Sequence, residues 1–111
     1  MKKVTIIDYG MGNLLSMQRA LEKNGAQVLV AVNPEQILQA EKLVLPGVGA
    51  FPDGMEELEK CGMVPAIREY VKTGKTLLGV CLGMQMLFEE SEEIRPTPGL
   101  SLIPGKVLKF P

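Results

Sequence analysis

The sequence predicts an α/β fold, with an open, mainly parallel sheet and helices on both of its faces. Short apolar, β-branched runs alternate along the chain with segments whose apolar residues recur at helical spacing. The first run, residues 4–9, is almost continuously apolar, which is typical of a parallel strand buried on both faces. The chain has 111 residues, so we expect a single domain.

Glycine and asparagine residues mark the first turn and the first helix. Gly10 and Gly12 turn the chain after the strand at 4–9, and Asn13 is a suitable N-cap for a helix that ends near Lys23. The apolar residues that share one face of this helix are Leu14, Met17 and Leu21. This spacing predicts an amphipathic helix packed on the sheet.

The remaining elements follow the same alternation. Further strands are expected at 27–32, 43–45 and 76–80, with a C-terminal pair at 100–103 and 106–110 across Pro104 and Gly105. Further helices are expected from Pro34 onward, in a turn or two around Met55 and Leu58, and at 64–72 and 82–90. Asn33 is the expected N-cap of the helix that begins at Pro34, with Ile37 and Leu38 facing the core.

Composition excludes several classes of function. The chain has 12 basic and 13 acidic residues and no basic block, which disfavours nucleic-acid binding. No apolar run approaches the roughly 18–20 residues of a membrane span, and Asp8 interrupts the N-terminal apolar run too early for a signal peptide. Cys61 and Cys81 lack metal-type spacing, so we expect a cytoplasmic protein without disulfides or a metal site. The chain contains no histidine, the commonest general base.

The sharpest motif is Gly79-Val80-Cys81-Leu82-Gly83, between a predicted strand and a helix that follows without a linker. It is the cysteine form of the G-x-S-x-G nucleophile elbow, whose side chain projects from the carboxyl end of a sheet. The helix N-terminus would favour the thiolate of Cys81, and the Leu82 N–H would donate to a developing oxyanion. The alternative is a buried, structural cysteine in an ordinary strand-to-helix turn.

A second glycine-rich segment, Pro46-Gly47-Val48-Gly49-Ala50-Phe51, follows the third predicted strand. The carboxyl ends of parallel strands lie at one edge of a sheet, so we expect this loop to lie beside Cys81. There it would supply a second backbone amide to an oxyanion. A simple turn is the alternative, because Gly and Pro occur in most loops.

Other segments are interpreted as structural. Gly10-Met11-Gly12 begins like a dinucleotide fingerprint, but a leucine stands where the third glycine belongs, which disfavours nucleotide binding. Cys61 has no elbow pattern around it and is expected to be structural. Met84 and Met86 are expected in the core, and the acidic run at 89–93 is expected at a solvated helix end.

Three stretches together resemble the class I, or triad, glutamine amidotransferases. They are residues 7–13, 45–51 and 79–91, and they are most similar to the glutaminase subunit of imidazole glycerol phosphate synthase, an enzyme of histidine biosynthesis. The resemblance implies a flavodoxin-like, class I glutamine amidotransferase fold. Family members continue past the equivalent of Pro111, so residues 1–111 are expected to form a truncated, N-terminal portion of such a domain.

The resemblance also implies roles for individual residues. Cys81 would attack the side-chain amide of L-glutamine, form a glutamyl thioester and release ammonia, while the amides of Leu82 and of Val48-Gly49 hold the oxyanion. The residues implied to contact the substrate are Gly47, Gly49 and Gln85, and the residue implied at the partner interface is Asn13. The ammonia would pass to a separate (β/α)8 cyclase subunit, which builds it into an imidazole ring and releases an aminoimidazole carboxamide ribotide. No cofactor is implied.

The family's catalytic histidine and glutamate come from the part that would follow Pro111. The chain therefore carries a nucleophile without a base, and the isolated chain is expected to show no useful glutamine turnover. Two other hypotheses stay open. The chain could be a flavodoxin-like docking module without chemistry, or an unrelated cysteine hydrolase of similar topology, which would react with esters and show no preference for glutamine analogues.

Overall fold

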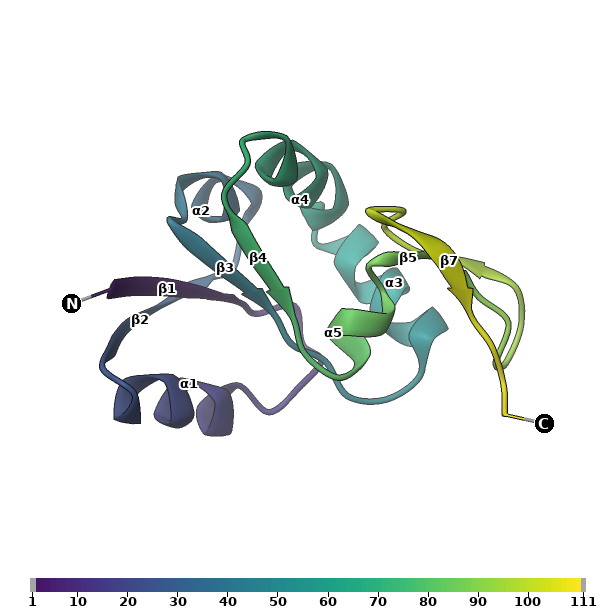
Figure 1. Ribbon diagram of the computed structural model, residues 1–111, viewed down its shortest axis with the longest axis horizontal. Coiled ribbons are helices and arrows are strands. Elements are labelled where there is room, and N and C mark those ends of the chain that lie inside the picture. Colours follow the sequence, from purple (N-terminus) through teal and green to yellow (C-terminus); the bar gives the residue numbers. More distant parts are fainter. Residues whose placement is uncertain (1, 111) are drawn as a thin grey trace.

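The computed structural model describes residues 2–110, which form a four-stranded sheet, the helices packed on its two faces, and a small second sheet (Figure 1). The elements in chain order are β1 (Lys2–Ile7), α1 (Leu14–Lys23), β2 (Ala26–Ala31), α2 (Pro34–Gln39), β3 (Lys42–Leu45), α3 (Phe51–Lys60), α4 (Met63–Lys72), β4 (Thr76–Gly79), α5 (Leu82–Gln85), β5 (Phe88–Ser91), β6 (Thr97–Pro98) and β7 (Ile103–Val107). The predicted fold class is confirmed.

The main sheet is parallel throughout and has the strand order β2-β1-β3-β4. Each strand is followed by at least one helix, so every strand points its carboxyl end at the same edge. Pairing between β3 and β4 continues beyond the strands, because Val80 N–H donates to the Leu45 carbonyl at 3.0 Å. The loops after β1, β3 and β4 therefore meet at one edge of the sheet.

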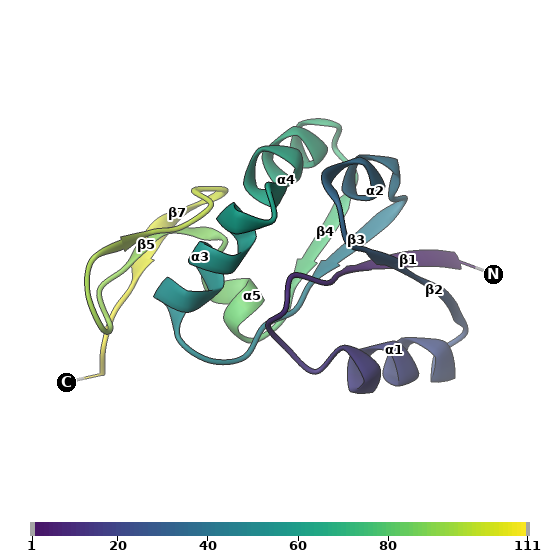
Figure 2. The same cartoon turned by 180° about the vertical axis from the view of Figure 1, so that it is seen from behind.

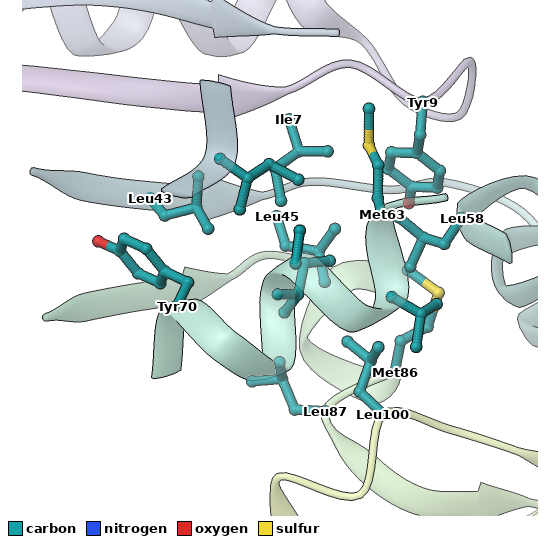
Figure 3. Close-up of a cluster of buried hydrophobic side chains, with 14 of the residues drawn as sticks. Ile7, Tyr9, Leu43, Leu45, Leu58, Met63, Tyr70, Met86, Leu87 and Leu100 are labelled. Carbon is teal, nitrogen blue, oxygen red and sulfur yellow. The ribbon is translucent and has the colours of Figure 1, made fainter. Parts of the chain in front are cut away.

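The two faces of the sheet bury different side chains. Val4, Ile6 and Val44 face α1 and form a small cluster with its apolar face. The opposite face is covered by α2, α3 and α4, as Figure 2 shows from behind. The larger core lies there; its side chains include Ile7, Leu43, Leu45, Leu58 and Met63 (Figure 3). The side chains of alternate residues in β1 and β3 thus pack into opposite cores, as expected of strands buried on both faces.

Both predicted helix caps are confirmed. The Asn13 side chain accepts from Ser16 N–H at 3.2 Å, and the Asn33 side chain accepts from Gln36 N–H at 3.0 Å. Pro34 occupies the first turn of α2, where its missing N–H costs nothing. These caps fix where α1 and α2 begin.

The first strand ends earlier than predicted. The predicted strand at 4–9 is observed at Lys2–Ile7, because the Asp8 carboxylate accepts from Gly10 N–H at 3.3 Å and turns the chain. Tyr9 is buried all the same, with 2% of its surface exposed. It lies beyond the strand at the edge where the loops meet.

The C-terminal third was predicted wrongly. The expected helix at 82–90 is the single turn α5, and the acidic segment after it lies partly in β5 rather than at a helix end. The expected strand pair at 100–103 and 106–110 is absent. Pro104 and Gly105 lie inside β7, which pairs with β5 in parallel, and β5 pairs with β6 in antiparallel orientation. The register shifts between Phe88 and Glu90, and such an irregularity accommodates proline in a strand.

Three single-residue expectations are also corrected. Leu38 is 41% exposed instead of facing the core, and Met84 is 46% exposed, whereas Met86 is buried as expected. Cys61 is exposed at the end of α3 and packs into no core. Within residues 2–110, no helix has the length and apolar character needed to cross a membrane, and no cluster of three or more potential ligand side chains could hold a metal ion.

Candidate active site

Cys81 occupies a strained turn between β4 and α5. Its backbone has φ +55° and ψ −122°, a conformation that residues with a side chain rarely adopt. Holding such a residue costs about 1–3 kcal/mol, and the surrounding structure must enforce it. The predicted nucleophile elbow is therefore present in its geometry, and Cys81 is exposed rather than buried.

The two glycines of the motif are required by close backbone packing. A Cβ at Gly79 would lie 2.7 Å from the Met84 Cα, and a Cβ at Gly83 would overlap the Leu45 carbonyl. Neither glycine has a positive φ, so their role is steric and does not depend on conformational freedom. The backbone of α5 thus lies directly against the ends of β3 and β4, which forces the turn at Cys81.

The helix dipole directed at Cys81 is smaller than the sequence suggested. The helix after Cys81 has 4 residues instead of the nine expected, so few peptide dipoles align toward the sulfur. Gln85 and Met84 donate their backbone N–H groups to the Cys81 carbonyl at 3.2 and 3.0 Å. These hydrogen bonds fix the turn, but they add no charge next to the sulfur.

The Leu82 N–H, the expected oxyanion donor, is engaged. It donates to the Gly47 carbonyl at 3.2 Å, which joins the elbow to the loop after β3. The loop and the elbow are neighbours, as their places after adjacent strands predicted. A developing oxyanion would have to replace the Gly47 carbonyl to receive this hydrogen bond.

Cys81 opens onto a cavity of about 280 Å³ on the α1 side of the sheet. The lining residues from α1 and its cap are Asn13, Ser16, Met17 and Ala20, and those from the sheet edge are Pro46, Gly47, Val48, Val80 and Cys81. None of these residues is charged. Orientation of a ligand here would rely on backbone groups and on the two short polar side chains of the α1 end.

The cavity brings together some predicted site residues and not others. Asn13, Gly47, Val48 and Cys81 all line it. The remaining predicted residues are Leu82, Gly49 and Gln85, which lie outside its lining. Leu82 is buried behind the turn, and Gly49 is exposed with φ +104°.

Sequence reasoning missed two groups of residues. Ser16, Met17 and Ala20 share the cavity with Asn13, and their spacing of three, four and seven residues after it would have identified them. Tyr9 was also missed. Its hydroxyl donates to the Pro46 carbonyl at 2.6 Å, and burial raises the pKa of this hydroxyl well above its ordinary value. Nothing in the sequence pairs Tyr9 with Pro46, which lies far along the chain.

Comparison with known families decides where the chain belongs. The family model described as glutamine amidotransferase class-I matches residues 5–108. The chain belongs to this family. The match includes the elbow, the loop after β3 and the cap of α1, so the recognised motifs and the observed site coincide.

Two similar relatives within the family carry the same name. The chain is 54% identical, over 106 residues, to the imidazole glycerol phosphate synthase subunit HisH of Halalkalibacterium halodurans, covering 96% of this chain and 50% of that protein. It is 50% identical to the subunit of the same name from Geobacter sulfurreducens, covering 100% of this chain and 53% of that protein. The chain thus spans about half the length of the curated relatives it matches.

The fold agrees with the family. A crystal structure of a glutamine amidotransferase superposes with a TM-score of 0.79 at 22% identity, covering 95% of this chain and 55% of that chain. At this identity the likeness shows the fold alone, and it extends to nearly the whole chain.

Proposed function

We propose that this chain provides the nucleophile and the oxyanion loop of a glutaminase subunit. The Cys81 thiolate bonds to the side-chain carbonyl carbon of L-glutamine, and the carbonyl oxygen becomes an oxyanion. A proton reaches the amide nitrogen, the C–N bond breaks, and ammonia leaves a glutamyl thioester. Water hydrolyses the thioester to glutamate and restores the thiol.

In this proposal the backbone around Cys81 stabilises the oxyanion. The Leu82 N–H and an amide of the Val48-Gly49 segment are the donors, once the Gly47 carbonyl releases Leu82. Gly47, Gly49 and Gln85 contact the glutamine. The half-buried Gln85 follows Cys81 by one helical turn, which suits a side chain that reaches the substrate from the same elbow.

The proposal also needs groups from outside residues 1–111. The sequence has no histidine, so a further polypeptide segment supplies the histidine in this proposal, together with the glutamate that accompanies it in the family. The ammonia passes to a (β/α)8 cyclase subunit of an imidazole glycerol phosphate synthase in the cytoplasm. In this proposal Asn13, which lines the cavity at the start of α1, contacts that partner.

The strained backbone of Cys81 is the observation that carries this proposal. A buried structural cysteine would gain nothing from a positive φ, whereas the elbow exposes the sulfur at the edge of the sheet where the loops meet. Strain of this kind persists at functional sites because the surrounding structure enforces it.

The chain contains its own control for a test of this function. Cys61 and Cys81 are the only cysteines, and both thiols are exposed. We would treat the chain with 6-diazo-5-oxo-L-norleucine, a glutamine analogue with an electrophilic carbon at the amide position, and separately with iodoacetamide. Peptide mass spectrometry then gives the ratio of Cys81 to Cys61 alkylation for each reagent.

We expect the glutamine analogue to favour Cys81 at least tenfold more than iodoacetamide does, because only the analogue uses the glutamine site. Excess L-glutamine should protect Cys81 and leave Cys61 unprotected. Equal ratios for the two reagents would support a docking module without chemistry, and faster acylation by simple esters would support an unrelated hydrolase. Ammonia release by the chain should not exceed that of Cys81→Ala.

A further inference from the structure

The Tyr9 side chain links the end of β1 to the loop that follows β3. It is 2% exposed, and its hydroxyl donates to the Pro46 carbonyl at 2.6 Å, across 37 positions of sequence. In Figure 3 its ring lies beside Met63 and Leu58 at one end of the larger core. A buried hydroxyl that meets a carbonyl at this distance holds that carbonyl firmly, because either group alone would be left unsatisfied.

Two successive carbonyls of the loop each accept a hydrogen bond. The Pro46 carbonyl accepts from Tyr9, and the Gly47 carbonyl accepts from the Leu82 N–H at 3.2 Å. A Cβ added at Gly47 would meet the Tyr9 hydroxyl at 2.5 Å and the Leu82 Cβ at 3.1 Å. Gly47 is therefore enclosed between the tyrosine and the elbow.

The geometry points to Tyr9 as a positioning residue of the Cys81 site. By fixing the Pro46–Gly47 peptide, its hydroxyl places the Gly47 carbonyl opposite the Leu82 N–H and restricts any rearrangement of the loop to the Gly47–Val48 peptide and the residues after it. The inference rests on the proposed function only where it treats Leu82 N–H as an oxyanion donor. The coupling between Tyr9 and Leu82 stands on the hydrogen bonds alone.

The second tyrosine of the chain supplies a matched control. Tyr70 on α4 is fully buried, and its hydroxyl donates to the carbonyls of Thr76 at 2.9 Å and Glu41 at 3.3 Å, away from the loop. Tyr9→Phe and Tyr70→Phe remove the same atom, in each case a hydroxyl that donates to backbone carbonyls. A merely structural role for Tyr9 would give the two variants the same effect at Leu82.

The test is amide hydrogen exchange of the 111-residue chain, followed by NMR. The exchange rate of the Leu82 N–H is divided by that of Ile6 N–H, in the central strand β1, to remove the contribution of global unfolding. We expect this ratio to rise roughly tenfold in Tyr9→Phe, as for the loss of one hydrogen bond, and to stay unchanged in Tyr70→Phe. An equal ratio in the two variants would overturn the positioning role.

A second readout connects the tyrosine to glutamine chemistry. The ratio of Cys81 to Cys61 alkylation by 6-diazo-5-oxo-L-norleucine should change severalfold in Tyr9→Phe and not in Tyr70→Phe. Suppose that the Leu82 exchange rate rises in Tyr9→Phe, but that neither the wild type nor any variant shows a higher Cys81 to Cys61 ratio with the analogue than with iodoacetamide. The proposed function then fails and the positioning role stands. If the wild type prefers the analogue and Tyr9→Phe changes neither readout, the positioning role fails and the function stands.

If Tyr9→Phe does not fold, the positioning role of Tyr9 can still be tested on the wild-type chain. A hydroxyl proton held at the Pro46 carbonyl should give its own NMR resonance, with a nuclear Overhauser effect to the Gly47 α-protons, since a Cβ at Gly47 would lie 2.5 Å from this oxygen. A Tyr9 hydroxyl without that effect would contradict the inference.

Discussion

The elbow at Cys81 and the loop after β3 lie side by side but are held by different forces. The elbow is confined by contact, because Gly79 and Gly83 leave no room for a Cβ against the neighbouring backbone. The loop is confined by two hydrogen bonds at Pro46 and Gly47, and beyond them Val48 is 56% exposed. Steric confinement gives way only when the sheet edge itself opens, whereas the Leu82 N–H can exchange the Gly47 carbonyl for another acceptor at small net cost.

Under the proposed function, this difference suits the two parts to different tasks. A nucleophile gains from a fixed direction, because a small displacement from the reacting carbon lowers the rate steeply. An oxyanion donor that is engaged by a carbonyl must be released before it can act, and a hydrogen-bonded loop permits that release. The site thus combines a rigid elbow with an exchangeable partner.

The largest expected effect is at the elbow. Gly83→Ala places a methyl group on the Leu45 carbonyl oxygen, which cannot move without opening the β3–β4 edge. We expect a loss of about 4 kcal/mol or more in the free energy of unfolding, measured by urea titration. The control is Gly25→Ala: Gly25 has φ +88°, and a Cβ added there would meet no atom within 4 Å, so this variant should lose only about 1 kcal/mol through backbone strain. Equal losses would mean that the elbow is not sterically confined.

The loop should tolerate the same change better. Gly49 has φ +104°, and a Cβ added there would meet only the flexible end of Met11, at 3.4 Å. Gly49→Ala should therefore cost about 1–2 kcal/mol from backbone strain, well below the cost at Gly83. The same urea titration checks this, and a loss as large as that of Gly83→Ala would remove the distinction between the two regions.

The strain at Cys81 predicts a variant that is more stable. Cys81→Gly relieves the unfavourable backbone and should gain about 1 kcal/mol after the entropic cost of glycine. Cys61→Gly is the matched control, because Cys61 has an ordinary helical conformation with φ −80° and should lose stability. A loss in both variants would show that the turn at Cys81 is not strained.

The smallest expected effect concerns pH and the tyrosine that holds the loop. Burial raises the pKa of the Tyr9 hydroxyl in the folded chain above its unfolded value of about 10. Above pH 10 the unfolded chain loses this proton while the folded chain keeps it, so stability should fall as the pH rises. Tyr9→Phe should remove part of this slope in denaturation curves at pH 9 and 10.5; an unchanged slope would mean that Tyr9 titrates normally when folded.

Local rules predicted the N-terminal part of the molecule well. Asn13 and Asn33 begin helices because a side-chain oxygen satisfies a nearby N–H, which depends on a few adjacent residues. The elbow was found for the same reason, since the glycines flanking Cys81 are part of a five-residue pattern. The neighbourhood of the loop and the elbow followed from parallel topology.

Features that depend on distant partners could not be predicted. Residues 82–90 have helical spacing, but β5 is formed instead because it pairs with β7 and β6, which follow later in the chain. The length of α5 is set by that competition and not by its own residues. The Tyr9–Pro46 contact is likewise invisible in sequence, because any buried tyrosine needs an acceptor and many carbonyls are available.

The strained turn also constrains when this corner of the molecule can form. The contacts that enforce φ +55° at Cys81 exist only after β3 and β4 have paired and α5 has closed on the Leu45 carbonyl. These pairings join segments separated by helices, so they are expected late in folding. The strain would then be absent from the transition state. Its relief in Cys81→Gly should appear as slower unfolding, with the folding rate unchanged.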